Sequence, residues 1–243
     1  MDERFRRAAA ILGEEAQERL TRCHVAVVGL GGVGSWCAEA LARSGIGALT
    51  LADSDAYSVS NRNRQLGALE STTGQSKAEV LAARVRDINP DCRVRALTLR
   101  YEAATREELF DTAYDYIVDA IDLVACKLDL IETAVKRGIP IVSALGTGNK
   151  RDASLLRLCD LSKTEGCPFA RVIRKELRAR GIAHLPVVFS PEPASAGETG
   201  EAPPPGRRSV PGSLVWVPAT AGMLLCQHVV LSLCESFAER DRG

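Results

Sequence analysis

Three absences narrow the class of this protein. The eight cysteines form no Cys-x-x-Cys pair, which argues against a zinc ribbon, and their scatter over 243 residues argues against a disulfide framework. The net charge is zero, with 31 basic and 31 acidic side chains, so overall charge does not indicate a nucleic-acid-binding protein. The charged N-terminus lacks the apolar core of a signal peptide. Free thiols without a signal peptide predict a cytoplasmic protein.

What is present is an alternation of strand-like and helix-like segments. Hydrophobic residues make up 46% of the chain, enough for a well-buried core. The expected strands are 25–28, 48–52, 93–97, 116–119 and 139–143, and the expected helices are 5–20, 36–42, 74–88, 107–111 and 127–136. This order predicts an α/β fold with a Rossmann-like, mostly parallel sheet and helices on both faces.

The pattern changes after Gly148. Residues 154–159 alternate like an edge or antiparallel strand, and a helix at 169–180, strands at 185–190 and 214–217 and a helix at 219–237 follow. We therefore predict an ATP-binding core at 1–150 and, in the same domain, an antiparallel C-terminal extension at 151–243 with a flexible loop at 191–211. The run 210–234 is long enough to span a membrane, but prolines and glycines interrupt it, so we expect a buried helix without stable membrane insertion.

A glycine loop follows the first expected strand and opens the first long helix. Its glycines are Gly29, Gly31, Gly32 and Gly34. In a strand–turn–helix unit, such glycines make the tight turn, let backbone amides approach phosphates and let the helix lie close to the strand. Asp53 ends the second strand about 20 residues further on, where an acid can bind ribose hydroxyls. The unit predicts a nucleotide site, with NAD as the default ligand.

Three later residues favour ATP over NAD. Arg64 and Lys77 are cations that could converge on a triphosphate and neutralise a leaving pyrophosphate. Asp122 follows the strand at 116–119, where it could hold Mg²⁺. Each residue also has a simpler interpretation: a surface ion pair for the two cations and a helix N-cap for Asp122. An NAD-dependent oxidoreductase needs none of the three.

Together these motifs resemble the ubiquitin-activating-enzyme-like (ThiF-type) adenylyltransferases. The resemblance covers residues 4–160 and includes GLGGVGS at 29–35, SNRNRQ at 60–65, Gly-x-x-Lys at 74–77 and Asp-x-x-Asp at 119–122. In that family the fold binds ATP and activates a carboxylate as an acyl-adenylate. The resemblance implies that Asp53 contacts the ribose and that Asp122 binds Mg²⁺. It implies phosphate contacts from Asn61, Arg64 and Lys77. It also implies a homodimer in which Arg7 reaches the ATP of the partner subunit.

Further segments are similar to one branch of that family, the bacterial tRNA threonylcarbamoyladenosine dehydratases. They include the stretches at 32–47, 163–178 and 211–222. The similarity implies ATP-dependent conversion of N6-threonylcarbamoyladenosine in tRNA to its cyclic form. It also implies a tRNA partner and allows a monovalent cation (K⁺ or Na⁺) and sulfur-transfer partners such as a cysteine desulfurase system. Three alternatives stay open: adenylation of the C-terminal carboxylate of a ubiquitin-like sulfur-carrier protein, an oxidoreductase, and a nucleotide-binding scaffold without catalysis.

The helix at 169–180 carries four cations at helical spacing. They are Arg171, Arg174, Lys175 and Arg178, which share one face. They are candidate tRNA contacts, although a solvated helix face would give the same pattern. Cys167, just before this helix, could accept sulfur; we expect instead a buried structural thiol.

Overall fold

The computed structural model describes residues 2–195 and 210–240, so most of the loop predicted at 191–211 lies outside the described residues. The α-helices are α1 Arg6–Leu12, α2 Glu14–Leu20, α3 Gly34–Arg43, α4 Lys77–Ile88, α5 Arg106–Leu109, α6 Val124–Lys136, α7 Pro168–Ala179 and α8 Trp216–Arg240. The strands are β1 His24–Val28, β2 Ala48–Ala52, β3 Arg93–Leu97, β4 Tyr116–Asp119, β5 Ile141–Ala144, β6 Arg157–Asp160 and β7 Pro186–Phe189.

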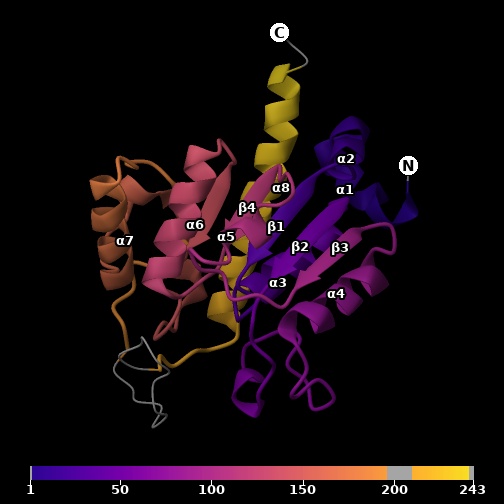
Figure 1. The fold of residues 1–243 in the computed structure, drawn as a ribbon. Helices are drawn as coiled ribbons and strands as arrows, with labels where there is room; N and C mark the ends of the chain where they lie inside the picture. The colour runs from indigo at the N-terminus through magenta and orange to yellow at the C-terminus, as the bar shows by residue number, and fades with distance from the viewer. Residues whose placement is uncertain (1, 196–209, 241–243) are drawn as a thin grey trace.

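The strands form one sheet in the order β3-β2-β1-β4-β5-β7-β6 (Figure 1). Every neighbouring pair is parallel except β6 and β7, which are antiparallel. The predicted fold class is therefore confirmed. The pairs Val28–Ala52 and Val28–Asp119 align the ends of β1, β2 and β4 at one edge, called here the carboxyl edge. Chain order reverses between β1 and β4, and ligands of such sheets bind at that point.

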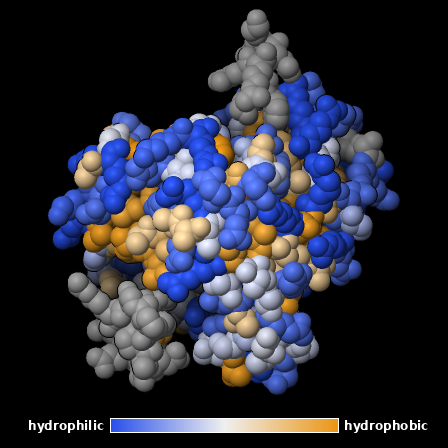
Figure 2. Space-filling model, viewed as in Figure 1, coloured by the Kyte–Doolittle hydropathy of each residue, from blue (hydrophilic) through white to orange (hydrophobic). Residues whose placement is uncertain are grey.

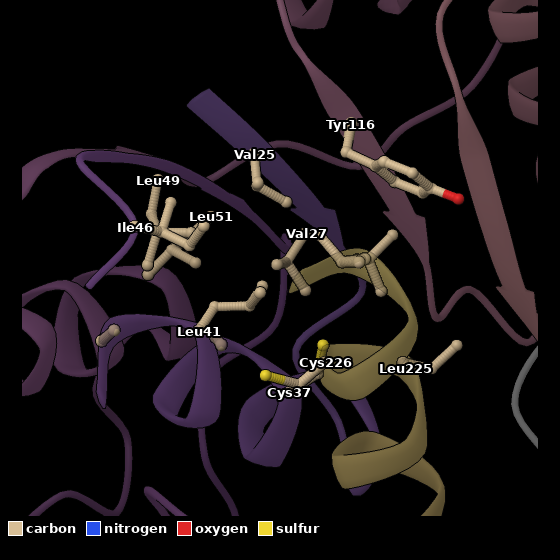
Figure 3. Packing of buried hydrophobic residues seen from close by; sticks show 14 of the residues in the cluster. Val25, Val27, Cys37, Leu41, Ile46, Leu49, Leu51, Tyr116, Leu225 and Cys226 are labelled. Atoms are coloured by element: carbon tan, nitrogen blue, oxygen red, sulfur yellow. The ribbon is translucent and has the colours of Figure 1, made fainter. Parts of the chain in front are cut away.

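Helices cover both faces of the sheet, and side chains alternate along β1 between two cores. Val25 and Val27 face the core built with α3, α4 and α8, which Figure 3 shows around Leu41 and Leu225. Ala26 and Val28 face the other core, built with α5, α6 and α7. Burial on both faces explains why the strands are apolar runs without a polar face.

The single N-terminal helix predicted at 5–20 is wrong. A short 3₁₀ turn, Glu3–Phe5, leads into α1, and Gly13 separates α1 from α2. Gly13 has φ of 92°, a conformation that glycine adopts without a steric penalty, and its N–H donates to the Ala9 carbonyl at 2.8 Å. The apolar spacing continues across the break, so periodicity alone could not reveal it.

The strand predicted at 214–217 is also wrong, because α8 begins at Trp216 and the preceding residues form a turn. A short apolar run fits a strand or a buried helix equally well, and Pro218 is tolerated in the first turn of a helix. The buried helix expected behind it is confirmed: Val217, Ala221 and Leu225 are fully buried. By length and composition Trp216–Glu235 could cross a membrane, but half of this window is buried within the fold.

Candidate active site

The glycine loop lies at the carboxyl edge, where it follows β1 and contacts the residue after β4. The Gly29 N–H donates to the Ala52 carbonyl at 2.9 Å, and Gly29 has φ of 89°. A Cβ on Gly29 would lie 2.7 Å from the Ala120 carbonyl oxygen, and a Cβ on Gly34 would lie 1.8 Å from the carbonyl oxygen of Gly29. Any larger residue at these two positions would push the loop away from the sheet.

The middle of the loop is more open. A Cβ on Gly31 would meet nothing closer than the Gln65 amide nitrogen at 3.8 Å, whereas one on Gly32 would lie 3.2 Å from Pro218 of α8. Helix α3 starts at Gly34 with neither a side-chain cap nor an acid in its first turn. An uncapped helix N-terminus behind an open glycine loop suits an anionic ligand such as phosphate.

Asp53 is fixed directly beside the glycine loop. One of its carboxylate oxygens accepts the Leu30 N–H at 2.7 Å and the other accepts the Asp55 N–H at 2.8 Å. Burial raises the pKa of Asp53, and the charge of Lys77 opposes this rise. The predicted ribose residue therefore stands where β2 ends, at the loop.

Lys77 is joined to the same group of residues. Its Nζ lies 2.8 Å from Asp55 and 4.0 Å from Asp53, and the residue is only 5% exposed. Lys77 therefore forms an ion pair, as the simpler interpretation expects, but its ammonium is buried rather than on the surface. Two carboxylates hold it at the first residue of α4.

The loop that contains Arg64 lies against the glycine loop. A Cβ on Gly32 would be 3.5 Å from Cγ of Arg64, and the indole of Trp36 donates to the Arg64 carbonyl at 3.2 Å. The Arg64 guanidinium donates to the Ser60 carbonyl at 2.9 Å. Asn61 accepts the Ser58 N–H at 3.1 Å and so caps a short 3₁₀ turn. Arg64 is thus placed at the glycine loop, whereas Asn61 shapes the loop backbone.

Asp122 follows β4 and is exposed. The Ala120 N–H donates to the Val28 carbonyl at 2.8 Å, which places the segment leading to Asp122 beside the glycine loop. Among the described residues, no three acidic, histidine or cysteine side chains gather to hold a metal ion. A single carboxylate beside a phosphate loop still fits Mg²⁺, which binds proteins through one or two carboxylates and takes its other ligands from phosphates and water.

Known proteins of one family are similar to this chain over most of its length. The profile of the ThiF family matches residues 5–235. This chain belongs to the ThiF family. It is 42% identical to the tRNA threonylcarbamoyladenosine dehydratase of Bacillus subtilis, over 94% of each chain. The Escherichia coli dehydratase TcdA, solved in complex with ATP, superposes with a TM-score of 0.88 at 36% identity, over 98% of this chain and 96% of that one. The complex of TcdA with AMP gives the same TM-score at 35% identity, over 99% and 96%.

Sequence reasoning missed one buried network at the site of this ThiF-family protein. Lys127 and Asp119 are fully buried, with the ammonium 2.6 Å from the carboxylate. The Ser143 hydroxyl donates to Asp119 at 2.6 Å, and Lys127 donates to the Ala144 carbonyl at 3.0 Å. Burial lowers the pKa of Lys127, and the carboxylate of Asp119 opposes this. The network ties the ends of β4 and β5 to α6; its only signal in the sequence was a lysine near an Asp-x-x-Asp motif.

Arg7 lies away from this site. The segments before and after α1 contact the end of the sheet opposite the glycine loop, called here the amino edge: Arg4 donates to Asn89 at 3.0 Å and Gln17 to the Ser44 carbonyl at 2.8 Å. Figure 1 shows both N-terminal helices at that end. Arg7 is exposed there.

The basic helix α7 presents three of its four predicted cations to solvent. Arg171, Lys175 and Arg178 are exposed and make no ion pair with any described residue, and Figure 2 shows hydrophilic residues at the outer side of α7. Arg174 is half-buried instead and donates to the Thr164 carbonyl at 2.6 Å. The thiol of Cys167 is buried and accepts the Ala170 N–H at 3.4 Å, as a structural thiol would.

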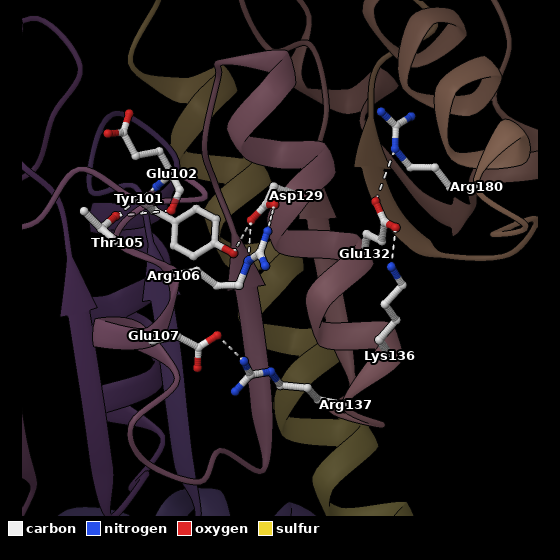
Figure 4. Close-up of polar contacts among 10 residues, drawn as sticks. All are labelled: Tyr101, Glu102, Thr105, Arg106, Glu107, Asp129, Glu132, Lys136, Arg137 and Arg180. Atoms are coloured by element: carbon white, nitrogen blue, oxygen red, sulfur yellow. Dashed lines mark hydrogen bonds and ion pairs between the residues drawn. The ribbon is translucent and has the colours of Figure 1, made fainter.

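Two arginines at the C-terminal ends of α6 and α7 are paired. Arg180 lies 3.3 Å from Glu132 and Arg137 lies 2.6 Å from Glu107, and Figure 4 shows both pairs. Arg171, Lys175 and Arg178 differ from these two arginines in having no such partner among the described residues.

Proposed function

We propose that this protein is an ATP-dependent tRNA threonylcarbamoyladenosine dehydratase. The observation that carries the proposal is the 42% identity to the Bacillus subtilis enzyme over 94% of both chains. The structure supports it, because a glycine loop, two cations and an acid meet at the carboxyl edge, as adenylation of a carboxylate requires. A reaction on tRNA also supports the predicted cytoplasmic location.

The reaction uses the site in two steps. Asp53 holds the ribose of ATP, the amides of Gly31 to Gly34 hold its phosphates, and Arg64 and Lys77 neutralise the pyrophosphate that leaves when the threonine carboxylate attacks the α-phosphate. Mg²⁺ bound at Asp122 would add further positive charge to the phosphates. The carbamoyl group of the same nucleoside then attacks the activated carbonyl and expels AMP, so that one water is lost overall. No enzyme nucleophile is needed, because the attacking group is tethered to the carbonyl.

The proposed enzyme is a homodimer. Arg7 lies at the edge opposite its own glycine loop, so it can contact ATP only in a partner subunit. A monovalent cation and sulfur-transfer partners are further proposals that the family resemblance alone supports.

Pyrophosphate release tests the proposed function. The protein is incubated with ATP and tRNA that either carries or lacks the threonylcarbamoyl group. Release with the modified tRNA only, together with a nucleoside lighter by one water, is the expected result. Release with a small carrier protein ending in Gly-Gly, and none with tRNA, would instead identify a carrier-activating enzyme.

The exposed face of α7 is proposed as a tRNA contact. Replacing Arg171, Lys175 and Arg178 by glutamine should weaken tRNA binding and flatten its salt dependence, because each lost phosphate contact lowers the slope of log Kd against log salt by about 0.7 to 0.9. The slope of the triple variant should therefore fall by about 2 to 3. Arg180→Gln is the matched control, since Arg180 is paired with Glu132 and Glu176. An unchanged slope in the triple variant would remove α7 from the tRNA interface.

A further inference from the structure

One aromatic side chain stands exposed beside the proposed active site. The indole of Trp216, the first residue of α8, is 50% exposed. Among the residues whose burial the structure describes (2–195 and 210–235), it is the only exposed Phe, Tyr or Trp. An exposed indole at the edge of a site offers a large apolar face on which a ligand ring can stack.

One hydrogen bond orients the indole, and two further contacts fix the chain on either side of it. Its Nε1 donates to the Arg151 carbonyl at 2.8 Å, in the loop that follows β5. Two residues along α8, Pro218 lies against the glycine loop, where a Cβ on Gly32 would be 3.2 Å from it. In the same loop as Arg151, Asn149 accepts the Gly212 N–H at 2.7 Å and so fixes the approach to α8. The indole of Trp216 is therefore oriented by the β5 loop, and the first turn of α8, to which it belongs, contacts the glycine loop through Pro218.

Its position separates Trp216 from the adenosine half of ATP. Asp53 follows β2 and marks the ribose side, to one side of β1 in the sheet order. The β5 loop that binds Trp216 lies on the other side of β1, beyond β4. That is the side left for the substrate carboxylate. Arg151, whose backbone carbonyl accepts the hydrogen bond from the indole, is exposed, and its side chain makes no ion pair with any described residue.

We propose that Trp216 is a stacking platform for an unpaired nucleobase of the tRNA loop that carries the modified adenosine, with Arg151 beside it for a backbone phosphate. The proposal rests on the proposed function. Proteins recognise single-stranded RNA loops largely by stacking splayed bases on aromatic rings, and a cation next to the ring binds the backbone. A fixed indole on the substrate side of the phosphate loop provides that arrangement.

Binding measurements on variants of Trp216 test the proposal. Trp216→Leu keeps an apolar side chain but has no aromatic face, and it should raise the Kd for the modified tRNA by about 5- to 150-fold. Trp216→Phe should restore most of the affinity, and the Kd for ATP should not change in either variant. Val135→Ala, a similarly exposed apolar residue near the end of α6, is the matched control and should bind tRNA as the wild type does.

Fluorescence gives a second readout, because the chain has only two tryptophans. An anticodon stem-loop RNA should quench the emission of the wild type, and the quenching should disappear in Trp216→Leu, where only the half-buried Trp36 remains. ATP alone should leave the Trp216 emission unchanged.

Three results would overturn the stacking proposal. The first is an unchanged tRNA affinity in Trp216→Leu. The second is quenching of Trp216 by ATP alone, which would mean that the ring stacks on adenine, and the third is a changed oligomeric state in Trp216→Leu, which would mean that the ring lies in a subunit contact. The proposed function fails separately, if the wild type releases no pyrophosphate with modified tRNA.

Discussion

Replacing Lys77 by alanine is expected to lower kcat/KM for tRNA-dependent pyrophosphate release by about 100- to 1000-fold. Removing one preorganised group that stabilises transition-state charge in a water-excluded site typically has an effect of this size. We propose this role for Lys77, because it is 5% exposed and two carboxylates lie within 4.0 Å of its ammonium at the start of α4. Without the ammonium, Asp53 and Asp55 would face the triphosphate with their negative charges uncompensated.

The stability of the variant must be measured beside its activity. Arg86→Ala is the control, since Arg86 lies on the same helix, is exposed, and its guanidinium donates to the Val94 carbonyl at 3.1 Å. Arg86→Ala should leave kcat/KM within about twofold, because Arg86 is not among the proposed site residues. The substitution should also leave the protein folded, since substitutions of exposed residues outside the core and buried networks usually change stability by about 0.5 kcal/mol or less. If the Lys77→Ala variant kept the wild-type kcat/KM, the ion pair of Lys77 with Asp55 would have a structural role only.

The second large effect concerns stability. Asp119→Ala is expected to lower the free energy of unfolding by about 3 to 5 kcal/mol, because it leaves the ammonium of Lys127 buried without a counter-ion. Both side chains are fully buried, and Lys127 would keep only the Ser143 hydroxyl at 2.9 Å and the Ala144 carbonyl at 3.0 Å. In a protein of this size the loss corresponds to a drop in Tm of roughly 6 to 20 °C.

Two further variants complete this experiment. The double variant Asp119→Ala with Lys127→Met removes both charges and should recover much of the lost Tm, since replacing a whole buried pair by apolar groups is often close to neutral. Asp111→Ala breaks the exposed pair with Arg95 and should cost about 1 kcal/mol or less. If Asp119→Ala cost no more than this surface control, the buried network would not hold the ends of β4 and β5 together.

The sequence determined the fold class and the place of the nucleotide loop. Apolar runs such as Val25–Val28 and Tyr116–Asp119 can be buried on both faces only in a parallel sheet covered by helices, so local pattern was sufficient there. Gly34 is dictated by its contact with the Gly29 carbonyl inside the motif, and Gly29 by its φ of 89° as well as by Ala120 after β4. Family membership followed from the same short motifs and is confirmed by the match over residues 5–235.

Tertiary structure decided how the charged and aromatic side chains are used. From the sequence, Lys77 could be a surface residue or a buried one. In the structure the loop after β2 places Asp55 within 2.8 Å of its ammonium. The pair of Asp119 and Lys127 spans a strand and a helix, and Trp216 meets Arg151 across 65 residues of chain. Such contacts produce no periodic pattern in the sequence, because they depend on which strand ends and loops the fold brings to one edge of the sheet. Burial, and with it the strength of every charge at the site, is therefore a property of the fold rather than of any local segment.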